Sequence, residues 1–360
     1  MKDKFFELVF KLYKIIYRLV TKATYIIITY RRCKNKPSLT KGEKKSICDF
    51  WKKYYGKKIP TYEYRWYKEK MGYADPRIIP DVIWHAVIEP AFVNLELEKG
   101  FQDKNYFDLI LGSNMPEVIL RCVNGELLDR NYMPLTPERA CSTLKSYEEV
   151  ICKPSIESGG GRGIFFMKNG QVSLDKLAQL KLNYNNDFII QKIVKQSLFM
   201  AQFNPNSLNT MRILTFLNDG KVLILSSFLR IGCSDSRLDN VSSGGAFVQI
   251  KENGTFGECA YKENLDSHDL YKAYTTLNGK SLSCYMIPNW GDIVQMVTLK
   301  HYRLAHFKII NWDIALDEKN APVIIEYNLI DSSVYFHQVN AGPVFGENTE
   351  YILKMVKGLK

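Results

Sequence analysis

Residues 309–328, IINWDIALDEKNAPVIIEYN, predict a β-hairpin that carries two carboxylates and an amide on one face. Apolar, strand-like runs fill both ends of this segment, and the polar residues 318–321 supply the turn. If Asp313 faces Glu326, the centre of the hairpin falls inside that turn, so the two side chains are expected to lie on adjacent strands. Asn328 lies two residues beyond Glu326 and is therefore expected on the same face.

This set of side chains predicts a metal site. Carboxylate and amide oxygens are the hard ligands that Mg²⁺ prefers, and two carboxylates are costly to bury side by side without a cation. Asp313, Glu326 and Asn328 are the predicted ligands. The alternative is that both carboxylates are solvated on an exposed sheet face.

A second feature lies near the middle of the chain. Lys153 ends a strand-like run, and the glycine-rich turn SIESGGGRGI at 155–164 leads into another. Glycines let backbone N–H groups approach an anion, and the lysine adds a point charge. The turn lacks both the Gly-Lys-Ser/Thr ending of a P-loop and the G-x-G-x-x-G spacing. The predicted phosphate contacts are Lys153, Ser158, Gly159, Gly160, Gly161, Arg162 and Gly163. The alternative is a flexible surface hairpin.

A lysine and glycine loop followed by Asp…Glu-x-Asn is similar to the ATP-grasp superfamily, and the set resembles its sugar-transfer-associated group. The segment 188–194 resembles the hinge strand against adenine, and Asn209-Thr210-Met211-Arg212 the arginine-bearing strand. The resemblance implies adenine contacts from Gln191, Lys192, Ile193, Val194 and Gln196. Two departures are Gln191 in place of an acidic hinge residue and Ser197 where this group would carry a histidine. Asp239, Asn240 and Gly244-Gly245 resemble a glycine-containing segment to which no role is assigned.

The resemblance implies an α+β fold in which two lobes close over ATP, and it implies ATP and Mg²⁺ as cofactors. Mg²⁺ would bridge the ATP phosphates, Lys153 would hold them, and Arg212 would stabilise the phosphoryl group in transfer. Arg230 on the neighbouring strand is a candidate for binding an acceptor carboxylate. A structural ion pair is the alternative role of Arg212.

The expected activity is that of an ATP-dependent carboxylate–amine ligase that works through an acyl phosphate. Its partners would be a carboxylate-bearing small molecule or saccharide and an amine, in the synthesis or modification of a capsule or exopolysaccharide. Two alternatives remain open: a sugar or polyol phosphotransferase, and a scaffold that binds nucleotide without turnover.

The charge of the chain is concentrated at its start. The formal net charge is +11, but residues 1–60 contain 17 Lys and Arg against 4 Asp and Glu, so the remainder is slightly acidic. A nucleic-acid-binding core would need its basic residues near its site, so nucleic acid is not expected as a partner. Eight scattered cysteines without a C-x-x-C pair predict reduced thiols in a cytoplasmic protein.

Residues 3–31 predict an amphipathic helix. Phe5, Leu8, Leu12 and Leu19 recur at helical spacing, and lysines and arginines between them make a transmembrane span or a signal peptide improbable. An anionic membrane surface, at the inner face of the cell membrane, is one expected partner of this helix. A core or protein-partner contact is the alternative.

Four regions are expected along the chain. Residues 1–36 form the basic helix, and 37–133 an α/β region packed on the catalytic body. Residues 134–205 form the lobe with Lys153, and 206–360 the lobe with the metal hairpin.

Overall fold

The structure, a computed structural model, describes residues 2–156, 161–233, 236, 237, 239, 241 and 244–358; the side chains of residues 2–8, 10, 11 and 14 are outside this description. Its helices are α1 (Lys2–Cys33), α2 (Lys41–Tyr54), α3 (Tyr62–Met71), α4 (Asp81–Ile83), α5 (Glu89–Phe92), α6 (Glu98–Phe101), α7 (Phe107–Leu111), α8 (Pro137–Lys145), α9 (Leu174–Asn183), α10 (Leu198–Ala201), α11 (Trp290–Tyr302), α12 (Val334–Ala341) and α13 (Thr349–Gly358).

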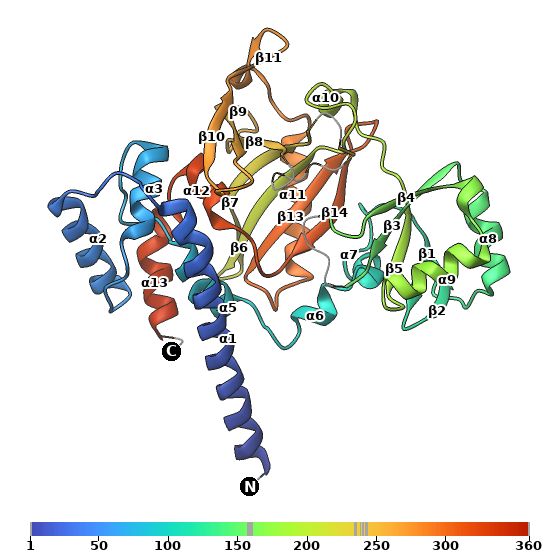
Figure 1. Ribbon diagram of the computed structural model, residues 1–360, viewed down its shortest axis with the longest axis horizontal. Coiled ribbons are helices and arrows are strands. Elements are labelled where there is room, and N and C mark those ends of the chain that lie inside the picture. Colours follow the sequence, from blue (N-terminus) through green and yellow to red (C-terminus); the bar gives the residue numbers. More distant parts are fainter. Residues whose placement is uncertain are drawn as a thin grey trace.

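The strands form two large sheets (Figure 1). Their bounds are β1 (Val118–Val123), β2 (Glu126–Asp129), β3 (Glu149–Pro154), β4 (Phe165–Lys168), β5 (Phe188–Lys192), β6 (Thr210–Asn218), β7 (Lys221–Ile231), β8 (Ala246–Ile250), β9 (Phe256–Glu263), β10 (Leu270–Tyr274), β11 (Thr276–Leu277), β12 (Lys280–Ser281), β13 (Ile309–Leu316) and β14 (Pro322–Asn328). The expected α+β class is confirmed.

The smaller lobe is a five-stranded sheet in the order β2-β1-β5-β3-β4, with α8 and α9 packed on it. Thr136 and Ser173 cap these two helices, since each hydroxyl accepts a backbone N–H of the first turn. β3 carries Lys153 and pairs with β5, the predicted hinge strand. This lobe was predicted to begin at residue 134, but two of its strands, β1 and β2, precede that position.

The larger lobe is a seven-stranded sheet in the order β10-β9-β8-β7-β6-β13-β14. The hairpin predicted at 309–328 is confirmed as β13 and β14, and Asp313 is the register partner of Glu326. β13 also pairs with β6, which places Arg212 opposite Asp313 on its other side. Helix α11 precedes this hairpin and ends at Tyr302, after which the chain turns towards β13.

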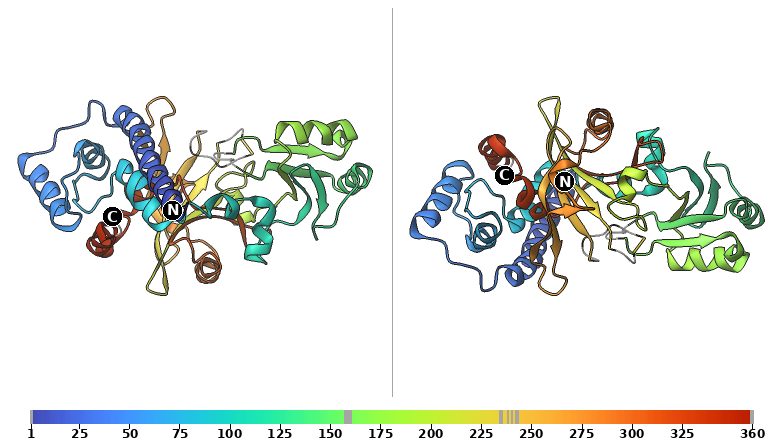
Figure 2. Two further views of the ribbon diagram at one scale, coloured as in Figure 1. Left: turned by 90° about the horizontal axis from the view of Figure 1, so that it is seen from below. Right: turned by 90° about the horizontal axis from the view of Figure 1, so that it is seen from above.

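Side chains alternate between the two faces of this sheet, and each face has its own core. On one face, Leu229 of β7 and Trp312 of β13 pack with α11. On the other, Phe228 of β7 and Ile309 of β13 pack with α12, α13 and the helices of the first 92 residues. Figure 2 shows these N-terminal helices and the five-stranded lobe at opposite ends of the large sheet.

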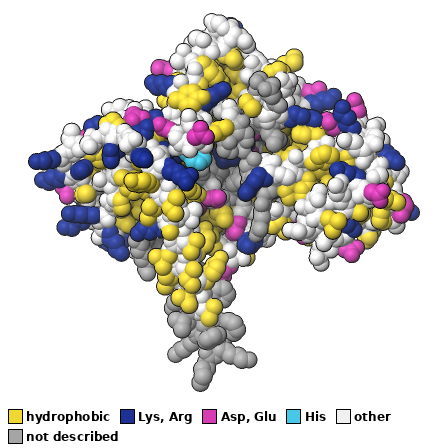
Figure 3. All heavy atoms as spheres, viewed as in Figure 1, with side chains coloured by type: hydrophobic (Ala, Val, Ile, Leu, Met, Phe, Trp, Pro, Cys, Tyr) yellow, Lys and Arg dark blue, Asp and Glu magenta, His cyan; other side chains and the backbone are white. Residues whose placement is uncertain are grey.

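The predicted N-terminal helix is confirmed as α1, and its two halves differ. The C-terminal end is built into the body: Thr29 and Arg32 are buried, and Arg32 pairs with Asp81 of α4 at 2.6 Å. The N-terminal part extends away from the body (Figure 1), and Figure 3 shows hydrophobic side chains along it. None of the described helices is apolar over enough residues to span a bilayer.

Candidate functional site

The centre of the site is the pair of carboxylates on β13 and β14. Asp313 is 3% exposed and lies between Arg212 and Glu326 in the sheet, so the exposed-carboxylate alternative does not hold for it. Glu326 is less enclosed, with a side chain 25% exposed. Asn328 follows on the same strand, and all three side chains line a cavity between the two lobes, described below. The sheet register therefore brings the three predicted metal ligands together.

Two arginines neutralise Asp313. Arg212 donates from Nε to Oδ1 at 2.5 Å and from Nη2 to Oδ2 at 2.8 Å, which is a bidentate fork. Arg230 adds a contact to Oδ2 at 3.2 Å. Burial acts to raise the pKa of Asp313, but the two guanidinium groups outweigh it, so the pKa is held below its usual value. Arg212 thus makes the ion pair that the sequence analysis left open as its alternative role, and it also faces the cavity.

Glu326 has a basic partner that the sequence analysis missed. Lys104 donates to Glu326 Oε1 at 2.9 Å from a short 3₁₀ helix at Lys104–Tyr106. This residue lies 222 positions from its partner and outside every motif, so no sequence signal pointed to it. Only the packing of the segment against β3, where its backbone bonds to Ser155, brings it to the site.

Lys153 faces the carboxylates from the smaller lobe. It is only 7% exposed, and burial lowers its pKa to about 8, with Glu326 opposing and Lys104 adding to that shift. A lysine with a pKa near neutrality in a cavity is typical of a functional site. The predicted position of Lys153 opposite the metal hairpin agrees with this geometry.

A cavity of about 440 Å³ separates the two lobes at this point. Its apolar wall comes from Ile151 and Phe166 of the smaller lobe, and its polar wall includes Lys153, Arg212 and Glu326. The hinge segment also lines it, as predicted, with Gln191, Lys192, Ile193, Val194 and Gln196. The Gln196 amide is engaged within the protein, since it bonds to Asn204 and to Asn209. Gln196 therefore fixes the chain between β5 and β6.

Within the glycine loop, the structure describes Ser155, Ile156 and the residues from Gly161 onward. Ser158, Gly159 and Gly160 lie outside the described residues. Gly161 lines the cavity of about 440 Å³ and has φ of 73°. Gly163 has φ of 76°, and a Cβ there would lie 3.2 Å from Pro154, so the loop needs glycine where it passes β3. Arg162 lies on the other side, in the larger cavity described below.

The segment after β7 positions Arg230. Asp239 is buried, accepts from Thr210 N at 2.9 Å and contacts Arg230 Nη2 at 3.2 Å. This gives the unassigned Asp239 a structural role as a second carboxylate behind the guanidinium. Asn240 lies outside the described residues.

Arg237 links the lobes across the cavity of about 440 Å³. Its guanidinium lies 3.5 Å from the ring centroid of Phe166 and donates twice to Glu149, at 2.9 Å each. Phe166 and Glu149 belong to the smaller lobe, whereas Arg237 follows β7. A cation stacked on an aromatic ring and paired with a carboxylate thus connects the two walls.

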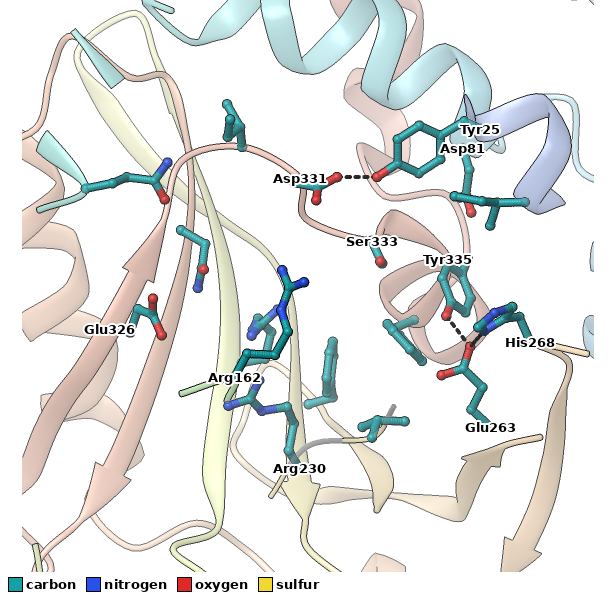
Figure 4. Close-up of a pocket in the computed structure, with 18 of the residues that line it drawn as sticks. Tyr25, Asp81, Arg162, Arg230, Glu263, His268, Glu326, Asp331, Ser333 and Tyr335 are labelled. Atoms are coloured by element: carbon teal, nitrogen blue, oxygen red, sulfur yellow. Dashed lines mark hydrogen bonds and ion pairs between the residues drawn. The ribbon is translucent and has the colours of Figure 1, made fainter. Parts of the chain in front are cut away.

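A larger cavity of about 840 Å³ adjoins the first one. The two cavities share Arg212, Arg230, Glu326 and Asn328. From these residues the larger cavity runs beneath α1 and α12. Figure 4 shows Arg162, Arg230 and Glu326 on one side of it, and Tyr25, Asp81, Asp331 and Tyr335 on the other.

The residues present fit a divalent cation. Among the described residues, no three His, Cys, Asp or Glu side chains gather as a metal site, and the candidate set is two carboxylates and one amide. The amide of Asn328 lies next to Asp313, because a hydrogen bond from its side chain contributes to the lowered pKa of that carboxyl. An amide flip would turn the oxygen of Asn328 towards the carboxylates, and oxygen is the atom that Mg²⁺ binds. A cation there would take over the neutralising role that Lys104 and Arg212 now have.

The lysine strand, the hinge strand and the carboxylate hairpin are arranged as in an ATP-grasp fold. The chain belongs to the sugar-transfer-associated ATP-grasp family, whose model matches residues 94–352. The resemblance inferred from the sequence is thereby confirmed, and the matched region includes both cavity-lining hairpins. Residues 1–93, with α1 and α4, lie outside the match.

Solved structures with a similar arrangement have low similarity scores. D-cycloserine synthetase DcsG has a TM-score of 0.43 at 12% identity, with 75% of this chain and 74% of that chain covered. L-amino acid ligase from Bacillus licheniformis has a TM-score of 0.38 at 13% identity, with 69% of this chain and 47% of that chain covered. D-alanyl-alanine synthetase A from Vibrio cholerae has a TM-score of 0.39 at 10% identity, with 72% of this chain and 66% of that chain covered. The chain thus spans about half the length of the Bacillus enzyme. A search of curated proteins found no match.

Proposed function

We propose that this protein is an ATP- and Mg²⁺-dependent ligase that joins a carboxylate to an amine. The carboxylate oxygen attacks the γ-phosphorus of ATP, the bond to the bridging oxygen breaks, and ADP leaves. The amine then attacks the carbonyl carbon of the acyl phosphate, the C–O bond breaks, and phosphate leaves with its electron pair while the nitrogen loses a proton. ATP is thereby converted to ADP and phosphate, and an amide is formed.

The observation that carries this proposal is the junction of the two cavities. The cavity of about 440 Å³ between the lobes has the apolar wall and hinge strand that suit a nucleotide base. The cavity of about 840 Å³ offers separate room for an acceptor. Both reach Arg212 and Arg230, so a phosphoryl group at the junction would lie next to both compartments.

The residues at this junction have separate roles in the proposed reaction. Asp313, Glu326 and Asn328 would hold Mg²⁺, which when bound neutralises phosphate charge. Lys153 binds phosphate oxygens from the smaller lobe, and Arg212 offers a planar fork to the transferred group. Arg230 is fixed by Asp239 and Asp313, so its guanidinium is held in place towards an acceptor carboxylate.

Product chemistry distinguishes the ligase from a kinase. The full-length protein is incubated with MgATP, pools of uronic acids or amino acids, and hydroxylamine in place of the amine. The proposal predicts ADP and a hydroxamate, because hydroxylamine attacks an acyl phosphate. A stable phosphate ester on a hydroxyl group would support the phosphotransferase instead. Nucleotide binding without ADP formation from any pool would support the scaffold.

We further propose that the substrate is part of a surface polysaccharide and that the reaction takes place at the inner face of the cell membrane. The family description supports an association with sugar transfer. The outward residues of α1 support the location: Leu12, Ile16, Leu19 and Val20 are each more than 50% exposed. Basic residues of the first 60 positions would add attraction to anionic lipid.

A further inference from the structure

The end of the larger cavity that lies away from the metal hairpin differs in its charged groups from the end near the hairpin. Its walls come from α1, α4, β9 and the segment from β14 into α12. Arg162 and Arg230 are at the junction side, whereas carboxylates and tyrosines occupy the far side (Figure 4). We call this far side the acidic end, defined by Tyr25, Asp81, Glu263, Asp331 and Tyr335.

Glu263 is a buried carboxylate that its neighbours hold in place at the acidic end. It is 5% exposed, and its Oε1 accepts from the Tyr335 hydroxyl at 2.9 Å and lies 3.1 Å from His268 Nδ1. These two contacts fix the carboxylate at the cavity wall. His268 is partly exposed at the rim, so it does not enclose Glu263. A buried carboxylate held at a cavity by neutral or weakly basic neighbours attracts a cation.

Asp331 faces the same space from the segment between β14 and α12. Its backbone is held at φ of 60°, an unusual conformation for a residue other than glycine or asparagine, and its side chain is 76% exposed. The hydroxyl of Tyr25 donates to its carboxylate, and the Tyr25 ring is stacked on His85 at 3.7 Å. Helix α1 therefore fixes the direction of the Asp331 carboxylate.

Asp81 supplies an independent observation. It is 2% exposed and lines the cavity, and its Oδ1 has no hydrogen-bond partner within the described residues. Its other oxygen pairs with Arg32 at 2.6 Å. Arg32 is buried and stacked over Trp66 and Tyr335, and its Nε has no hydrogen-bond partner within the described residues. Arg32 thus neutralises Asp81 through one carboxylate oxygen, while the other oxygen has no partner among the described residues.

We infer that the acidic end binds the ammonium group of the amine substrate, and that α1 is a wall of this amine site. Two carboxylates and a spare carboxylate oxygen at the wall of one cavity form the kind of anionic surroundings that recognise an ammonium group. The inference rests on the proposed ligase function. It adds that two residues of the amine site, Tyr25 and Asp81, come from outside the part of the chain matched by the family model.

The placement of these charges also gives the two substrates a defined orientation. The arginines at the junction attract the carboxylate substrate and repel an ammonium group, whereas the acidic end does the opposite. The two substrates would therefore bind in one orientation across the cavity of about 840 Å³. The Tyr25–Asp331 contact links α1 to the segment that follows β14, the strand of Glu326 and Asn328.

Binding to the full chain loaded with Mg²⁺ and a non-hydrolysable ATP analogue tests this inference. The probes are glucosamine with N-acetylglucosamine, and cadaverine with 1,5-pentanediol, measured by calorimetry. We expect at least one free amine to bind at least tenfold more tightly than its neutral counterpart. Glu263→Gln and Asp331→Asn should each weaken that amine at least fivefold and leave the affinity for the ATP analogue unchanged.

Asp266→Asn is the matched control, because Asp266 is exposed near Glu263 and does not line the cavity. Asp331→Asn changes an exposed side chain, so it keeps the test valid if Glu263→Gln does not fold. Equal binding of amine and neutral probe, no binding of either amine, or unchanged amine affinity in both variants would overturn the inference. Amine binding without any hydroxamate product would instead overturn the ligase function and leave the amine site standing.

Discussion

Arg212 and Asp313 lie opposite each other on β6 and β13 and form a bidentate ion pair inside the sheet, with the guanidinium Nε 2.5 Å from the carboxylate Oδ1. The same carboxylate is a predicted Mg²⁺ ligand, and the same guanidinium is predicted to bind the transferred phosphoryl group. In the structure each group thus neutralises the other. For both predicted roles to hold, Mg²⁺ would have to replace Arg212 as the partner of Asp313. The transferred phosphoryl group would have to replace Asp313 as the partner of Arg212.

Arg212→Lys is predicted to lower kcat by more than tenfold while the Kd for MgATP changes little. Lysine keeps the positive charge but loses the planar fork that matches phosphate oxygens. Steady-state rates of ADP release and nucleotide titrations measure the two quantities. Arg139→Lys on the exposed surface of α8 is the control. Equal losses in rate and affinity would assign Arg212 to ground-state binding or folding.

Glu326→Gln is predicted to abolish Mg²⁺-dependent ADP formation and leave the fold intact. The change removes one of two anionic ligands, a loss on the order of several kcal/mol in the stabilisation of phosphoryl charge. Its side chain is partly exposed, and in the free protein the change removes the ion pair with Lys104 and the attraction between Glu326 and Lys153. Glu318→Gln in the turn of the same hairpin is the control. Asp313→Asn is a poorer test, because it would leave Arg212 and Arg230 without their shared carboxylate. Wild-type turnover of Glu326→Gln across a magnesium titration would rule out the metal assignment.

The affinity for MgATP is predicted to fall as the pH rises from 7 to 9. Burial lowers the pKa of Lys153 to about 8, so this lysine is mostly charged at pH 7 and mostly neutral at pH 9. If phosphate binding needs the charged form, the Kd should rise about tenfold over this range. Lys153→Arg should remove the dependence, because a guanidinium stays charged. A flat profile in the wild type would show that Lys153 does not hold the phosphates.

His301 is predicted to make the fold sensitive to acid. It is buried in α11 between Thr215 and the Phe307 carbonyl, and burial lowers its pKa to about 4. The unfolded chain binds this proton first as the pH falls below 6.5, so stability is lost between pH 6.5 and 4. Between pH 7 and 4.5 this one group should reduce the free energy of unfolding by roughly 2–3 kcal/mol.

Denaturant unfolding at both pH values measures the effect of His301. His301→Gln should lower the stability at pH 7 and show a smaller loss on acidification. His306→Gln, an exposed change five residues away, should behave like the wild type. The same acid dependence in the wild type and in His301→Gln would assign the loss to other groups.

The outward side of α1 is predicted to bind anionic membranes. Leu12→Ser, Ile16→Ser and Leu19→Ser together should abolish co-sedimentation with phosphatidylserine vesicles at low salt, because the apolar contact is lost. Removal of residues 1–36 would be a poorer test, since it deletes Arg32 from its buried pair with Asp81. The control is Leu182→Ser with Leu198→Ser, two exposed leucines on the body. If the wild-type protein ignores these vesicles, the outward side serves another partner.

The sequence by itself determined the hairpin at 309–328 and the strands of Lys153, Arg212 and the hinge. These segments have strong local signals: apolar runs of strand length, a polar turn between them, and an equal count of residues on both sides of it. The predicted pairing of Asp313 with Glu326 is present in the structure, but it depends on a β-bulge, because Ile314 pairs with Ile324 and the register shifts by one residue between Ile314 and Asp313.

Only the tertiary structure decided which groups surround those carboxylates. Lys104 reaches Glu326, and Arg212 reaches Asp313, because segments far apart in the chain pack side by side. The role of α1 was open for the same reason. Its spacing shows two faces but not what each face contacts, and only packing reveals that Tyr25 and Arg32 enter a cavity wall while Leu12 and Leu19 remain outside. Local periodicity fixes the elements of this chain, whereas contacts between distant segments fix the site.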